Sequence, residues 1–450
     1  MIGDTGELLA LAQQVVDQAR PGEQLECVVG RSRGTSVKAY GGEVESFTSA
    51  ESFGLGIRVI VDHRQGFAHA GSHATDVVAA TLAEARDNAG FGEPDEWNGL
   101  AAPDGVPVVE QDLWDEALFA TTTERKVELA LELERRVTGL DPRVTAVRSA
   151  GYGDGSGEFA VCSTAGIAVA GRSTHCSISA SALAHDGAET QIGGAVDVGR
   201  QPAHLDLVQV AADAVDRATR MLGASPTDSQ RLTVVLDPRV AATLLGIAGG
   251  TLSGDRVQRG RSPFADRLGE AIASPVLTLA DDPTDARSMA ADSHDGEGLA
   301  CRRNPLIVDG VLDRFLYDGY SARRAGTTST GSAVRGSRST PGVGCQALAV
   351  VPGDRSPEEL IAGIDRGILV QSLSGVHSGV NAVSGDFSVG AEGLLIRDGA
   401  LAEPVREVTL GSTIQRLLLG VEAVGDDLEW LPGGTGSATL VIADVSLGGR

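Results

Sequence analysis

Three histidines that lie close together in the sequence are its clearest candidates for metal chemistry. His63, His69 and His73 stand in a strand-like and glycine-containing segment, and imidazole nitrogens are common zinc ligands. A zinc peptidase, however, usually places a glutamate beside the first of two histidines about one helical turn apart, so that metal-bound water faces a general base. The sequence contains no His-Glu pair. These histidines therefore predict at most an alternative metal site.

Two further segments contain residue types used in hydrolysis or in peptide binding. Gly30-Arg-Ser-Arg-Gly34 matches the Gly-x-Ser-x-Gly elbow of serine hydrolases, but it lies between two strand-like runs instead of a strand and a helix. We therefore expect a hairpin turn there. His377 stands in a loop of small residues, 374–379, where an imidazole can meet a peptide backbone. His377 is thus the candidate peptide-binding residue.

Glycine-rich segments and lysines give no sign of a nucleotide site. Gly54-Leu-Gly56 and the glycines of 151–157 do not match the dinucleotide fingerprint, and turns explain them better. The only lysines, Lys38 and Lys126, do not follow a loop of the P-loop type. The sequence excludes a P-loop nucleotide site.

The composition narrows the possible partners and the compartment. The chain has 37 Lys and Arg against 61 Asp and Glu, a net charge of −24, which would repel a nucleic-acid backbone or an anionic membrane. No apolar run approaches the roughly 20 residues of a membrane helix, and the first residues do not resemble a signal peptide. The five widely spaced cysteines include no Cys-x-x-Cys pair. These features predict a cytoplasmic protein with reduced, mostly buried thiols.

Hydrophobic periodicity predicts a mixed layer of helices and strands in the first half of the chain. The connection 91–111 shows no periodicity, and a sheet is expected over 143–198. Helices are predicted from Asp4 to Arg20 with an Asp4 to Glu7 capping box, from Thr75 to Ala85, from near Thr121 to Val137, and from Leu207 to Leu222 with Asp206 as the cap; strands are predicted at 25–29, 35–40 and 54–61.

Strand and turn signals dominate the second half, which we expect to begin near residue 228. Two segments, 306–312 and 394–401, place Asp-Gly between apolar residues, the pattern of a tight hairpin. A helix is expected after Ser356-Pro-Glu-Glu359, and another over 413–421. The predicted fold is α+β, with an N-terminal mixed α/β domain over 1–228 and a β-rich, barrel-like domain over 229–450.

Short sequence blocks follow one another along nearly the whole chain, at 54–59, 66–68, 234–255, 261–264, 268–270, 281–283, 295–298, 310–316, 321–323, 387–393 and Gly399. In their residues and in their order, these blocks resemble the TldD and TldE (PmbA) metallopeptidase family.

In the catalytic TldD branch, the resemblance implies a helix with His-Glu-x-x-x-His and a cysteine near the C-terminus. Aligned on Gly254 and Asp255, the corresponding residues here are Leu245, Gly246 and Gly250, and residues 431–450 contain no cysteine. Leucine and glycine neither ligate zinc nor move a proton. The sequence is therefore similar to the TldE branch, and no metal is expected in this chain.

The resemblance implies a cytosolic heterodimer in which a TldD-type partner holds zinc and both chains enclose a cleft for unfolded peptides. Family roles are protein turnover and peptide maturation. Two alternatives remain open. One is a homodimeric peptide-binding or scaffold protein without catalysis. The other is an independent enzyme that uses His63, His69, His73, His377 or the cysteines.

Overall fold

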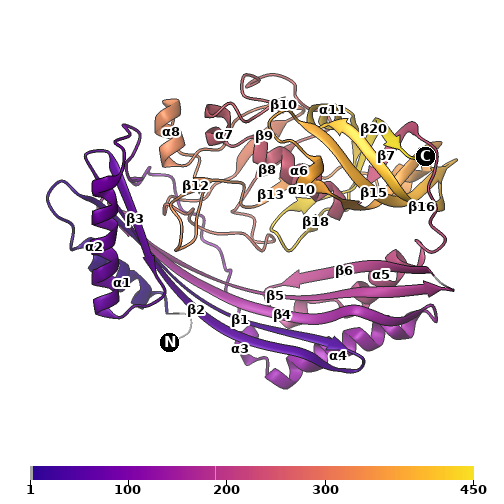
Figure 1. The fold of residues 1–450 in the computed structure, drawn as a ribbon, viewed down its shortest axis with the longest axis horizontal. Helices are drawn as coiled ribbons and strands as arrows, with labels where there is room; N and C mark the ends of the chain where they lie inside the picture. Colours follow the sequence, from indigo (N-terminus) through magenta and orange to yellow (C-terminus); the bar gives the residue numbers. More distant parts are fainter. Residues whose placement is uncertain (1–3, 188) are drawn as a thin grey trace.

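The N-terminal half of the computed structural model, which describes residues 4–187 and 189–450, is a single large antiparallel sheet. Its strand order is β3-β2-β1-β4-β5-β6, and Figure 1 shows it extending beneath the C-terminal half. Its strands are β1 (Gln24–Tyr40), β2 (Glu43–Val61), β3 (Arg64–Ala70), β4 (Val144–Ser163), β5 (Ala168–Asp186) and β6 (Glu189–Gly199).

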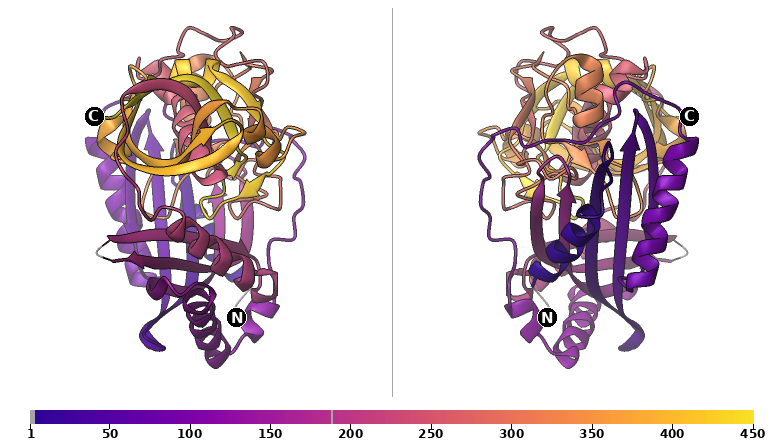
Figure 2. Two further views of the ribbon diagram at one scale, coloured as in Figure 1. Left: turned by 90° about the vertical axis from the view of Figure 1, so that its right-hand side faces the viewer. Right: turned by 90° about the vertical axis from the view of Figure 1, so that its left-hand side faces the viewer.

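Helices cover one face of this sheet and leave the other face to the C-terminal half (Figures 1 and 2). Successive side chains in a strand point to opposite faces, so every second residue points to the helices. The apolar side chains among these form two buried clusters with the helices. These helices are α1 (Gly6–Val16), α2 (Thr75–Phe91), α4 (Thr123–Leu140) and α5 (Leu207–Thr219), and two short elements, α3 (Ala117–Ala120) and η1 (Pro202–His204), lie between them in sequence.

The helix predictions hold for α4 and α5 and need correction for α1 and α2. The side chain of Asp206 caps α5, as predicted, by accepting hydrogen bonds from the N–H groups of residues 208 and 209. The predicted capping box of Asp4 is wrong, because the N-cap of α1 is Thr5. Helix α2 continues to Phe91 instead of ending near Ala85, because its last turns pack against β3, where Gly66 has no Cβ to obstruct them.

The predicted turns at three glycine-containing segments are wrong. Residues 30–34 lie inside β1, residues 54–56 inside β2, and residues 151–157 inside β4. Glycine within a strand often marks a place where another backbone approaches closely. A Cβ at Gly54 or Gly56 would collide with Ser337 of the C-terminal half. These glycines therefore give room for contacts between the two halves and do not reverse the chain.

The C-terminal half contains a closed five-stranded barrel, as expected for a barrel-like domain. Strands β16-β15-β14-β7-β20 are neighbours in that order, and a pairing between β16 and β20 closes the barrel. Its strands are β7 (Gln230–Leu236), β14 (Arg366–Ser374), β15 (Asp386–Arg397), β16 (Ala400–Thr413) and β20 (Leu440–Gly448), with β17 (Val421–Val424) paired to β20.

A second, smaller sheet and several short helices complete this half. The sheet order is β10-β9-β8-β13-β19-β18. The strands are β8 (Leu279–Asp281), β9 (Asn304–Val308), β10 (Val311–Leu312), β13 (Leu348–Val350), β18 (Glu429–Trp430) and β19 (Gly436–Ser437), with β11 (Ala333–Val334) and β12 (Gly342–Val343) as a separate pair; the helices are α6 (Pro238–Thr251), α7 (Gly254–Gln258), α8 (Gly319–Ala325), α9 (Pro357–Ala362), α10 (Val376–Gly379) and α11 (Ile414–Leu419).

Both predicted Asp-Gly hairpins are present. Asp309 and Gly310 have φ of 47° and 78°, and Asp398 and Gly399 have φ of 49° and 77°. Two successive positive φ values are what a tight two-residue hairpin turn requires. Helix α9 has the predicted capping box between its N-cap serine and the glutamate three residues later. The α+β prediction is therefore confirmed, while the division at residue 228 stays a prediction.

The connection after α2 is irregular, as predicted, and is tied to the C-terminal half by Arg323 of α8. Residues 92–115 form no helix or strand apart from one isolated bridge at Pro94. The Arg323 guanidinium donates to the carbonyl oxygens of Trp97 at 2.8 Å and Gly99 at 2.8 Å. All five cysteines are free. Within the described residues, no helix is both long and apolar enough to span a membrane.

Candidate functional site

A cleft of about 690 Å³ lies between the open face of the sheet and loops of the C-terminal half. Strands β1, β2, β4 and β5 form its floor, and residues 290–296 and 333–338 form its wall. Its volume is within the range of pockets that bind small molecules or short peptide segments. The cleft is therefore the best-defined candidate binding site among the described residues.

A row of glycine and serine crosses the floor of the cleft because the strand register brings these residues side by side. Gly30 lies opposite Gly54, and Ser32 lies opposite both Ser52 and Gly157. The next strand continues the row with serine at position 173. All of these residues line the cleft. This row of small polar residues is flanked by larger side chains of the same strands, such as Phe53, Phe159 and Arg172.

The wall contributes two carboxyl groups and one histidine. Burial raises the pKa of Asp292 to about 6. Burial also raises the pKa of Asp295 to about 6, although three backbone N–H groups that donate to this carboxyl act in the opposite direction. His294 lies between them, and its buried Nδ1 has no hydrogen-bond partner in the described part of the chain. The wall thus has groups that change protonation near neutral pH.

A buried ionic network joins the floor to the wall. The Arg58 guanidinium donates two hydrogen bonds to Glu26, at 3.1 and 2.8 Å, and Arg335 pairs with the same carboxylate. Burial opposes the charge of Glu26, but the two guanidinium groups outweigh it and lower the pKa of Glu26. Because Arg335 belongs to the loop that lines the cleft, this network fixes the wall against the sheet.

A second carboxyl group, Glu297, also belongs to this network, but it pairs less closely with Arg58 than Glu26 does. Its nearest guanidinium contact is to Arg58 at 3.8 Å, and it accepts a hydrogen bond from the N–H of Gly319 at 2.6 Å. Burial raises its pKa to about 7, and the charge of Arg58 only partly opposes this. The protonation of Glu297 therefore responds to pH changes around neutrality.

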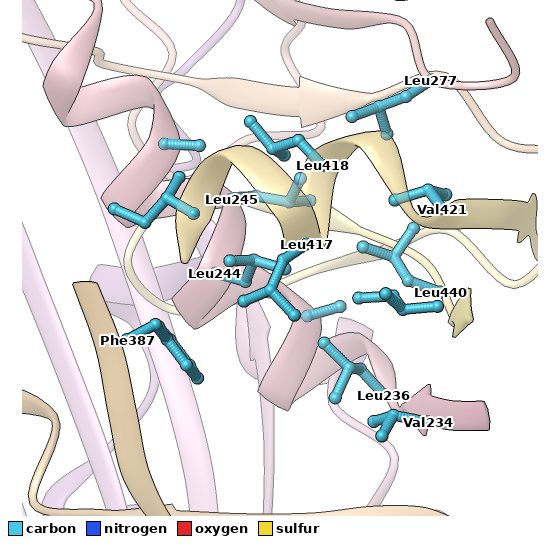
Figure 3. Close-up of a cluster of buried hydrophobic side chains, with 14 of the residues drawn as sticks. Val234, Leu236, Leu244, Leu245, Leu277, Phe387, Leu417, Leu418, Val421 and Leu440 are labelled. Atoms are coloured by element: carbon cyan, nitrogen blue, oxygen red, sulfur yellow. The ribbon is translucent and has the colours of Figure 1, made fainter. Parts of the chain in front are cut away.

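The three positions aligned with a zinc motif lie on α6 but do not share one face. Leu245 is fully buried in the apolar core beneath α6 (Figure 3). A Cβ at Gly246 or Gly250, one helical turn apart, would meet no atom within 4 Å. These residues have no side-chain atom able to bind a metal. Within the described residues, no group of three His, Cys, Asp or Glu is arranged to hold a metal ion.

The three histidines of the N-terminal half lie at different places around β3. His63 stands in the turn before β3 with a φ of 63°. His69 lies near the other end of the strand beside Phe67, and His73 packs edge-on against Phe53 at 5.2 Å between ring centroids. The structure therefore does not bring His63 together with the other two.

His377 lies on the short helix α10 and is exposed to solvent. It is not among the residues that line the 690 Å³ cleft. The role of His377 in peptide binding stays a prediction. The candidate binding residues in the cleft are different ones.

Sequence reasoning missed the residues that define the cleft. Glu26 is a charged residue inside the apolar run 25–29, and this was the one available signal for a buried ion pair. Arg335 gave no such signal, because its partner Glu26 is 309 residues away in the chain. The glycines of the floor at positions 30, 54 and 157 lie in segments for which the sequence predicts turns.

Comparison with known proteins assigns the chain to a class of metallopeptidases. Three family models match: PmbA/TldA metallopeptidase domain 1 over residues 25–89, the central domain over 116–222 and the C-terminal domain over 229–449. The chain belongs to the PmbA/TldD metallopeptidase family.

Individual relatives match over most of their length. Metalloprotease PmbA of Escherichia coli O157:H7 is 28% identical, with 90% of this chain and 88% of that protein covered. A metalloprotease TldD homologue of Haemophilus influenzae is 28% identical, with 88% and 86% covered. The crystal structure of TldE from Thermococcus kodakarensis matches with a TM-score of 0.88 and 25% identity over 99% of each chain.

Proposed function

We propose that this chain is the metal-free subunit of a two-chain zinc metallopeptidase, and that it helps to hold unfolded peptides while a TldD-type partner supplies the zinc. The observation that carries the proposal is the combination of family membership with a zinc-motif helix that has Leu245, Gly246 and Gly250 at the aligned positions. A peptidase in this family without these groups needs them from another chain.

The cleft supports a role in holding peptide. An extended peptide binds with little sequence preference when its backbone, and not its side chains, makes most of the hydrogen bonds. The row of glycine and serine in the floor offers hydroxyl groups and leaves space for varied side chains. The ionic network around Glu26 keeps the wall at a fixed position above this floor.

The test measures cleavage of an unfolded polypeptide by the chain alone, by the TldD-type protein alone and by their mixture. We expect efficient cleavage only in the mixture. A mixture in which the metal-binding histidines of the TldD-type protein are replaced serves as the control and should be inactive. Metal-dependent cleavage by this chain alone, or an inert mixture of correctly folded proteins, would refute the proposal.

A further inference from the structure

The outer half of β2 is a free strand edge. Strand β3 pairs only with residues 55–61 of β2, and in the described part of the chain no strand lies beside residues 43–53 on the side away from β1. Figure 1 shows β3 near one end of the sheet, while the β1–β2 hairpin continues beneath the C-terminal half. We call residues 43–53 the β2 edge segment.

This edge lacks several of the features that natural proteins use to protect a free strand. Such edges are usually short, covered, bulged, or interrupted by proline or charged residues. The β2 edge segment has three glutamates and one register shift, between Val44 and Ser46, but it contains neither proline nor lysine, and residues 43–52 are all exposed. It also carries two exposed apolar side chains, Val44 at 41% and Phe47 at 44% exposure. A long, exposed edge of this kind is a template for an added strand.

The other edge of the same sheet, strand β6, makes contacts with side chains of this chain. On β6, the carbonyl oxygen of Gly194 accepts hydrogen bonds from two guanidinium groups, of Arg217 at 3.0 Å and of Arg239. Helix α5, which contains Arg217, also packs on β6. Among residues 4–187 and 189–450, the chain therefore supplies partners for the β6 edge and supplies no strand for the β2 edge segment.

Charge indicates which kind of chain fits the β2 edge segment. Its only charged residues are Glu43, Glu45 and Glu51, and in the part of the chain that the structure describes only Glu51 forms an ion pair, with Arg33 of β1. A second copy that paired antiparallel about the middle of the segment would place Glu45 opposite Glu51 twice, and like charges opposite one another are destabilising. The net charge of −24 opposes such self-association as well.

We propose that a β-strand of the partner subunit adds to the β2 edge segment, and that this strand carries lysine or arginine opposite Glu43 and Glu45. The inference rests on the proposed function, because it takes the TldD-type chain as the occupant. The added strand would continue the sheet from one subunit into the other and would reach the cleft, because residues 52 and 53 at the end of the segment line it.

Hydrogen exchange of the full-length chain, alone and in complex with its TldD-type partner, tests the inference. We expect the outward-pointing amides of the β2 edge segment, which do not donate to β1, to exchange freely in the chain alone and to become protected in the complex. A complex in which this segment exchanges as in the free chain overturns the inference and leaves the proposed function standing. If no complex forms, the proposed function fails together with the inference.

A charge-reversal pair provides the second measurement. The variant Glu43→Lys/Glu45→Lys should bind the partner roughly tenfold more weakly or worse, with the difference shrinking as salt is added. The control Glu84→Lys/Asp87→Lys makes the same charge change on the exposed side of α2 and should leave affinity nearly unchanged. Equal affinities of the two variants contradict the proposal. Protection of the segment by an unfolded peptide or by a second copy, without the partner, contradicts it too.

Discussion

The two faces of the N-terminal sheet are built from the same six strands but from different kinds of residue. The face under the helices is apolar and includes Leu25, Ile57 and Ile178, each fully buried. The face toward the cleft has glycine and serine at positions such as 30, 32 and 157. Burial of apolar area stabilises a fold, and glycine and serine provide little of it. The comparison teaches that the first face supports the fold, and that the second, outside a small buried cluster around Val28 and Val161, is available for contact with another molecule.

The largest expected effect concerns the charges that hold the cleft-facing side together. Replacing Arg58 with methionine removes a buried partner of Glu26 and leaves Glu297 without its guanidinium, which should lower the free energy of unfolding by about 3–5 kcal/mol. Urea denaturation measures this. The control Arg231→Met breaks an exposed pair with Asp444 and should cost less than about 1 kcal/mol. Similar small losses in both variants would show that the network does not stabilise the cleft.

A pair of neighbouring substitutions on β5 tests the difference between the faces directly. Ile178→Ala removes a fully buried side chain under the helices and should cost about 2–5 kcal/mol. Ser179→Ala changes the exposed neighbour on the cleft side and should stay within about 0.5 kcal/mol. Both are measured by chemical denaturation. Comparable losses in the two variants would remove the distinction between a supporting face and a contact face.

Much of the fold was predictable because its signals are local. Asp309-Gly310 encodes a hairpin through its own φ preferences, and Asp206 caps α5 through hydrogen bonds to residues two and three positions away. The glycines of β1, β2 and β4 were misread as turns, because the reason for them lies elsewhere in the chain. At Gly54 that reason is the close approach of Ser337, which no local pattern reveals.

The free energy of unfolding should depend on pH through Glu297, the carboxyl group between the floor and the wall of the cleft. The pKa of Glu297 is raised from 4.5 to about 7 by burial, so the folded chain holds a proton there that the unfolded chain has lost. Its stabilising contribution is therefore complete below about pH 4.5 and is lost as pH rises toward 7. Relative to Glu297→Gln, the wild type should lose up to about 1.4 kcal/mol per pH unit in this window. Parallel stability curves would contradict the raised pKa.

The smallest expected effect concerns the open side of α6. Gly246→Ala should raise the free energy of unfolding by about 0.5–1 kcal/mol, because alanine favours a helix and its Cβ would meet open space. At Gly249 a Cβ would lie 2.8 Å from Leu348 and 3.1 Å from Cys345, so Gly249→Ala should be destabilising. Thermal unfolding distinguishes the two. A loss of stability at Gly246 would mean that this side of α6 is not open.

The central claim, that this chain is the metal-free half of a metallopeptidase, is tested most directly by the zinc content of the purified complex. Metal analysis should find no zinc in this chain alone, and one zinc per pair of chains in its complex with the TldD-type partner. All of that zinc should be lost when the metal-binding histidines of the partner are replaced, while the complex still forms. Stoichiometric zinc in this chain alone, or zinc retained by the complex after those replacements, would contradict the account.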